Sequence, residues 1–174
     1  MTCITYLKAQ EVGLFAYDHL IKVPPAASSG TQAVGLSMKQ DTSAFVADRE
    51  LIQALEKRSQ PVSCGEDLVL FSQGEAPVGL YILRSGEATL VMRSESGEEV
   101  MCLRVPAGSL IGLPAIIGNK PYTLTATARQ GSEVKFVTRV DFEDLTRAEP
   151  SLCFKMLEVL AAEVRAARNV LIAS

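Results

Sequence analysis

Residues 68–86, LVLFSQGEAPVGLYILRSG, carry the clearest structural pattern in the chain. The stretch contains two apolar runs, at residues 68–71 and 80–84, and glycines stand in the breaks beside them. Short apolar runs between glycine-containing turns are typical of β-strands, because glycine tolerates the backbone conformations of tight turns. The stretch therefore predicts two strands joined by a turn.

The same pattern continues toward the C-terminus. Further apolar runs follow at residues 88–93, 100–105, 122–128 and 134–138, with Gly97, Gly108 and Gly131 in the breaks. Residues 88–92 alternate between two faces, as strands with one buried face do. Short strands at near-regular spacing predict a mainly β fold, a small sandwich or barrel.

Helices are predicted on both sides of the strands. Asp48 can cap a first helix that buries Leu51, Ile52 and Leu55 and ends near Ser59, before Pro61. After the strands, Asp141 can cap a short helix that contains Phe142 and Leu145 and is closed by Pro150. The domain is therefore expected to be β-structure with flanking helices.

A long C-terminal helix is predicted over about residues 151–171. Its apolar or small residues recur every three or four positions, at Cys153, Met156, Leu160, Val164, Ala167 and Leu171. In one interpretation this stripe packs on the β-structure. In the other it pairs with a second subunit through Met156, Leu160, Val164 and Ala167, and Glu158, Glu163, Arg165 and Arg168 flank the seam.

Composition narrows the function. The chain has 174 residues, 48% of them apolar, and a net charge of −3, which favours one soluble domain over a nucleic-acid binder. No apolar stretch reaches transmembrane length and no export signal stands out, so we expect no membrane association. Its four cysteines, Cys3, Cys64, Cys102 and Cys153, form no Cys-x-x-Cys pair, and His19 is the single histidine. We therefore expect no metal, no cofactor and no enzymatic activity, and a cytoplasmic location.

The N-terminal residues 1–37 form a poorly defined arm in this interpretation, because residues 23–30 are rich in helix breakers. An alternative is that Met38 is the natural start. Residues 38–174 then make up the folded domain.

Four segments carry a family resemblance: LFSQGE at residues 70–75, GLYILRSG at 79–86, Gly97 with Glu98, and PAGSLIG at 106–112. In this order they resemble the cyclic nucleotide-binding domain of the catabolite activator protein (Crp–Fnr) superfamily, over about residues 45–171. The resemblance implies a double-stranded β-helix, or jelly roll, with a long C-terminal helix. It also implies a regulatory role in signal transduction or transcription.

The family's ligand chemistry lies in a phosphate cassette, here residues 112–123. The resemblance places the candidate site at Gly112, Leu113, Pro114, Ala115, Tyr122 and Thr123. Leu113 stands where the family has a glutamate for the ribose, and Tyr122 where it has an arginine for the phosphate. Thr123 keeps the family's hydroxyl. Because both departures remove charge, we expect weak binding of cyclic AMP and cyclic GMP.

Two interpretations of the altered cassette stay open. Leu113, Ile116, Ile117 and Tyr122 either add to the core, with the Tyr122 hydroxyl bonded to the backbone, or line a pocket for a small, mostly apolar or neutral effector. Lys120 is expected to point to water.

The sequence favours a non-enzymatic sensory or regulatory module that forms a homodimer. An alternative is a Crp–Fnr-type transcriptional regulator that lacks, or is separated from, its helix-turn-helix domain. The chain ends at Ser174, directly after the long helix, so we expect no DNA binding by this chain alone. A cupin-like barrel enzyme is a third, less favoured class.

Overall fold

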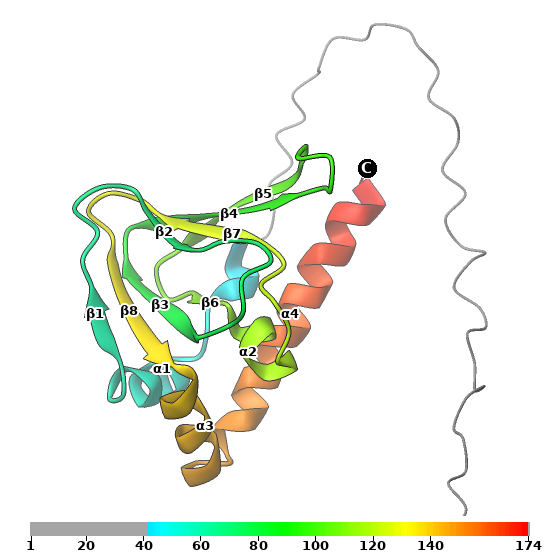
Figure 1. Ribbon diagram of the computed structural model, residues 1–174. Coiled ribbons are helices and arrows are strands. Elements are labelled where there is room, and N and C mark those ends of the chain that lie inside the picture. The colour runs from blue at the N-terminus through cyan, green and yellow to red at the C-terminus, as the bar shows by residue number, and fades with distance from the viewer. Residues whose placement is uncertain (1–41, 174) are drawn as a thin grey trace, which may run out of the picture. The chain divides into compact units, whose positions relative to one another are not determined.

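The computed structural model describes residues 42–173, where the chain forms eight strands in two antiparallel sheets (Figure 1). One sheet has the order β1-β8-β3-β6 and the other the order β2-β7-β4-β5. The strands are β1 (Gln60–Val62), β2 (Leu68–Phe71), β3 (Gly79–Ser85), β4 (Glu87–Arg93), β5 (Glu99–Pro106), β6 (Leu110–Ile111), β7 (Thr125–Ala128) and β8 (Glu133–Thr138). The predicted mainly β fold with flanking helices is confirmed.

Helices surround the two sheets. They are the 3₁₀-helix η1 (Thr42–Phe45) and the α-helices α1 (Arg49–Glu56), α2 (Leu113–Gly118), α3 (Arg139–Ala148) and α4 (Leu152–Ala173). As predicted, the Asp48 side chain caps α1 by accepting from the Glu50 N–H at 2.8 Å. Lys155 of α4 lies 2.8 Å from the same carboxylate, so this ion pair joins the two helices. None of the helices described here is long and apolar enough to cross a membrane.

The cap predicted for α3 is wrong by three residues. Thr138, with an extended backbone, precedes the helix, and its side-chain oxygen accepts from the Asp141 N–H at 3.1 Å. The Thr138 hydroxyl in turn donates to the Asp141 carboxylate at 2.6 Å. Asp141 therefore lies in the first turn, where an acidic side chain is favoured by the helix dipole.

The strand predicted over residues 122–128 begins only at Thr125. The reason is that Tyr122 pairs with a turn: its N–H donates to the Glu75 carbonyl, and its carbonyl accepts from the Gly74 N–H. The two shortest strands, β1 and β6, were not predicted. β1 is at the edge of its sheet, which is where a strand tolerates Pro61.

Two apolar cores hold the domain together. The roll core lies between the sheets and includes Phe71, Leu90, Ile111 and Tyr122. The helical core gathers side chains of α1, α2, α3, α4 and the strands beside them, and it contains Leu51, Leu80, Leu113, Leu145 and Leu152. α4 serves both, since Met156 and Val159 are in the helical core while Ala162 and Ala166 pack against the roll core.

The proposed arm of residues 1–37, with Cys3, His19 and the alternative start at Met38, lies outside the described residues.

Candidate functional site

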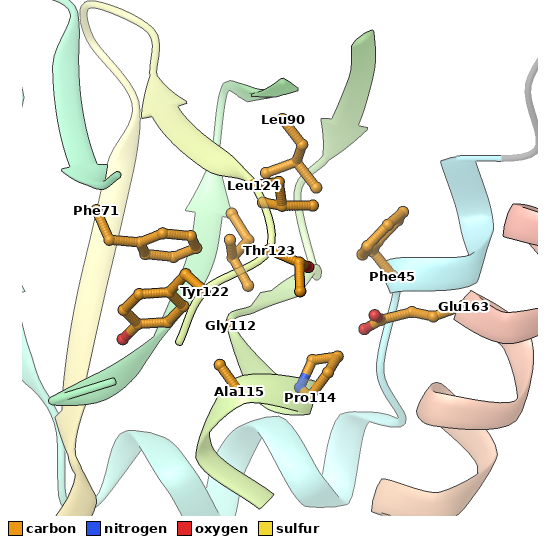
Figure 2. A pocket seen from close by; sticks show the side chains of 11 residues that line it. Phe45, Phe71, Leu90, Gly112, Pro114, Ala115, Tyr122, Thr123, Leu124 and Glu163 are labelled. Carbon is orange, nitrogen blue, oxygen red and sulfur yellow. The ribbon is translucent and has the colours of Figure 1, made fainter. Parts of the chain in front are cut away.

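A small pocket lies between the roll core and α4 (Figure 2). Its cavity volume is about 60 Å³. Five of the six candidate cassette residues line it, namely Gly112, Pro114, Ala115, Tyr122 and Thr123. The sixth, Leu113, is 0% exposed and belongs to the helical core. The structure therefore brings the cassette together as a site but turns Leu113 away from it.

Gly112 allows the cassette backbone to approach the aromatic wall. Its φ of 93° lies in the left-handed region, which favours glycine. A Cβ at this position would lie 3.0 Å from the Tyr122 ring and 3.4 Å from the Phe71 ring. The first of these distances is tight, so a larger residue would require the Tyr122 ring to shift by a few tenths of an ångström, in addition to the strain of the positive φ.

Tyr122 forms one wall of the pocket and is held from two sides. Its ring stacks on Phe71 with 3.8 Å between the centroids, and its hydroxyl donates to the Gly79 carbonyl at 2.6 Å. The side chain is 3% exposed, and burial raises the pKa of its hydroxyl. The Tyr122 hydroxyl thus has the backbone partner that the core interpretation expected.

The other apolar residues predicted for this space do not line it. Ile116 is in the helical core, and Ile117 is exposed on the surface of α2. Lys120 is exposed, as predicted. The lining contains no lysine or arginine. Its apolar walls come from Phe45, Leu90, Ile111 and Leu124 in place of Ile116 and Ile117.

Glu163 of α4 supplies the one ionisable carboxyl of the lining. Its Oε1 is buried and has no hydrogen-bond partner among the residues that the structure describes. Burial alone raises the pKa of this carboxyl from its ordinary value of 4.5 to about 8. The sequence placed Glu163 only beside a helix seam, and its position at the pocket was not predicted.

The residues predicted for a dimer helix divide between two faces of α4. Met156 is 2% exposed and, with Leu160 beside it, packs in the helical core. Val164 and Ala167 are exposed. The outward apolar face carries Phe154 and Leu157, which are 68% and 57% exposed, together with Val164.

The described part of the chain contains no cluster of histidine, cysteine, aspartate and glutamate residues that could hold a metal ion. Cys64, Cys102 and Cys153 are free thiols.

Comparison with known proteins identifies the family. The family described as "Cyclic nucleotide-binding domain" matches residues 61–149, about half of the chain. The chain belongs to the cyclic nucleotide-binding domain family. The resemblance to the Crp–Fnr superfamily is also confirmed, since the curated relatives of this chain include a CRP-like regulator and a fumarate and nitrate reduction regulatory protein.

Two such relatives are each 28% identical to this chain. The CRP-like cAMP-activated global transcriptional regulator of Mycobacterium tuberculosis matches over 68% of this chain and 53% of its own length. The fumarate and nitrate reduction regulatory protein of Escherichia coli matches over 67% and 45%. The chain thus spans about half the length of the curated relatives it matches.

Solved structures show the same fold. The Thermus thermophilus catabolite activator protein superimposes with a TM-score of 0.63 at 22% identity, covering 72% of this chain and 59% of that one. The sensor domain of the transcriptional regulator DNR from Pseudomonas aeruginosa gives 0.55 at 19% identity, covering 70% and 82%.

Proposed function

We propose that this chain is a non-enzymatic sensory or regulatory domain of the Crp–Fnr type whose pocket does not bind cyclic AMP or cyclic GMP with high affinity. One observation carries the proposal. The hydroxyl of Tyr122, the residue that the resemblance places where the family has its phosphate-binding arginine, is already bonded to the Gly79 carbonyl.

The charges of the pocket support this proposal. An arginine–phosphate hydrogen bond contributes about 1.5–3 kcal/mol, and a buried phosphate without a cation carries a further penalty. Here the ionisable group beside the cassette is the Glu163 carboxyl, which repels an anion once it is ionised. The loss of the arginine alone corresponds to a weakening of about ten- to a hundred-fold.

The size of the pocket points the same way. Pockets for drug-sized ligands have volumes of roughly 300–1,000 Å³. The cavity here is about 60 Å³, because Phe71 and Tyr122 fill space beside the cassette. A nucleotide would have to displace these rings or move α4.

Calorimetric titration with cyclic AMP and cyclic GMP tests the proposal. We expect no binding tighter than the high micromolar range. Submicromolar binding of either nucleotide, weakened by Thr123→Ala, would contradict it, because Thr123 is the family hydroxyl that the cassette keeps.

We propose further that two copies pair through the outward face of α4. Phe154, Leu157, Ala161 and Val164 follow each other at spacings of three, four and three, which is the spacing of a coiled-coil seam. This seam replaces Met156 and Leu160, which are used within the domain, keeps Val164 and does not include Ala167.

Light scattering tests the pairing. The full chain should have the mass of two copies, and Leu157→Glu should lower it toward one copy, since a charge is costly in a dry seam. Gln53→Glu adds the same charge at an exposed position of α1; it is the matched control and should leave the mass unchanged. A wild-type chain with the mass of one copy would contradict the pairing.

A second candidate is a transcriptional regulator whose DNA-binding part lies outside this sequence. It is favoured by the curated relatives, which are transcriptional regulators about twice the length of the matched region. The coding DNA beyond Ser174 would distinguish the two, since a helix-turn-helix segment there supports this second candidate. The cytoplasmic location and the absence of DNA binding by this chain alone stay predictions.

A further inference from the structure

We propose that the pocket binds a small organic cation, whose ammonium group pairs with Glu163 and whose apolar part packs against the aromatic walls. This inference rests on the proposed function, since it names the effector class of the same pocket. It also reverses the charge preference of the family's phosphate cassette.

The Glu163 carboxyl is the first observation that carries the inference. It extends from α4 toward the pocket, between Phe45 and Pro114 (Figure 2). Its Oε1 is buried without a hydrogen-bond partner in residues 42–173. A buried oxygen of this kind is costly unless a donor reaches it, so a ligand that brings an N–H group would stabilise the site.

The surroundings favour a cation over an anion. The two short helices beside the carboxyl, η1 and α2, contain no charged residue, and the lining contains no lysine or arginine. Lys120 lies two residues after the end of α2, and Arg165 lies two residues after Glu163 on α4. Both are exposed, and neither lines the pocket. The Glu163 carboxyl therefore has no counter-ion among the residues of the described lining, and a ligand cation can serve as its partner when it ionises.

The other walls suit the apolar part of such a ligand. Phe45 lies beside the carboxyl, and the stacked pair of Phe71 and Tyr122 lies across the pocket from it (Figure 2). The Phe45 ring is close enough to the carboxyl to attract the ammonium group, because aromatic faces attract cations. The side chains of Leu90 and Leu124 provide contacts for a short alkyl group.

The cavity volume limits the ligand to a few non-hydrogen atoms. A water molecule needs roughly 10–15 Å³ of such volume, so about 60 Å³ holds only a handful of atoms. Ethylammonium is a probe of suitable size. Because so few atoms contribute binding energy, its dissociation constant should lie in the millimolar range.

Binding of a cation should release a proton. Below about pH 8 the carboxyl is protonated, and pairing with ethylammonium breaks its O–H bond and passes the proton to the buffer. The affinity should therefore rise as the pH rises toward about 8 and level off above it, as long as the amine stays charged.

The experiment is a titration of the full chain, labelled at its leucine and isoleucine methyl groups, with ethylammonium chloride followed by NMR. Ethanol and sodium acetate serve as neutral and anionic probes of similar size. We expect ethylammonium to shift the methyl signals of Leu90, Ile111 and Leu124, with higher affinity at about pH 9 than at about pH 6. Ethanol and acetate should leave these signals unchanged at the same concentrations.

Matched variants separate the pocket carboxyl from general charge effects. Glu163→Gln keeps the shape of the protonated acid and should weaken ethylammonium binding at least about tenfold. Glu158→Gln removes the same charge from an exposed position of α4 and should have no effect. Equal binding by wild type and Glu163→Gln, tighter binding of acetate, or no shift with ethylammonium would overturn the inference.

Cyclic AMP added to the same samples separates the two proposals. Tight binding of cyclic AMP contradicts the proposed function. Absence of binding by both cyclic AMP and ethylammonium contradicts only the cation inference.

Discussion

The two candidate residues Leu113 and Tyr122 lie in different cores of the domain. Leu113 joins the helical core, where it is fully buried among aliphatic side chains. Tyr122 joins the roll core and forms a wall beside a remaining cavity that contains the Glu163 carboxyl. The two residues that the resemblance marks as departures thus lie in different places: Leu113 fills core space, whereas Tyr122 lines the pocket. Of the two cores, the roll core is the one that borders the pocket.

The largest effect should come from the helical core. Leu152→Ala removes a side chain that is 1% exposed and should lower the free energy of unfolding by about 2–5 kcal/mol. Urea denaturation measures this change. Leu157→Ala, on the outward face of the same helix, is the control. At a protein concentration low enough to keep the chain monomeric, it should change the free energy of unfolding by no more than about 0.5 kcal/mol. Equal losses for Leu152→Ala and Leu157→Ala would contradict the assignment of faces.

An intermediate effect should come from Glu163, through pH. Its raised pKa means that the folded state holds a proton that the unfolded state loses above about pH 4.5. The stabilising contribution is therefore complete below pH 4.5 and is lost as the pH rises to about 8. The slope for one proton is at most about 1.4 kcal/mol per pH unit, which gives a loss of a few kcal/mol in total.

Unfolding of Glu163→Gln measured from acidic to alkaline pH checks this sign. The variant should lose that part of the pH dependence, whereas Glu158→Gln should keep it. Superimposable pH profiles for wild type and Glu163→Gln would show that the carboxyl is not buried as described.

The smallest effect should come from the hydroxyl of Tyr122. Tyr122→Phe removes its hydrogen bond to Gly79 and should cost about 1 kcal/mol in urea denaturation. Tyr81→Phe is the matched change and should cost less, since the Tyr81 hydroxyl donates to the Leu70 carbonyl at 2.8 Å from a partly buried position. If Tyr122→Phe is as stable as the wild-type chain, or costs less than Tyr81→Phe, then the hydrogen bond of the Tyr122 hydroxyl does not hold the wall of the pocket in place.

Local patterns were sufficient to predict most of the fold. The alternation in β4, the Asp48 cap and the spacing of apolar residues in α4 follow from contacts between residues close in sequence. β6 was missed because two residues show no alternation, and they pair with Tyr81 and Ile82 far away in the chain.

The candidate site was predicted less completely for the same reason. The cassette could be placed from its glycine and its neighbours, but the side to which Leu113 turns depends on packing against other helices. Glu163 lies 40 residues beyond the last cassette residue, Thr123. Only the packing of α4 against η1 and the roll core shows that this glutamate, and not Glu158 five residues earlier, faces the pocket.

The most direct test is an NMR titration of the Glu163 side-chain carboxyl in the full chain, with its carbon signal assigned by comparison with Glu163→Gln. A buried carboxyl without a partner predicts a midpoint near pH 8. A midpoint near the ordinary value of 4.5 would contradict the account, because Glu163 would then be solvated and the pocket would contain no unpaired carboxyl.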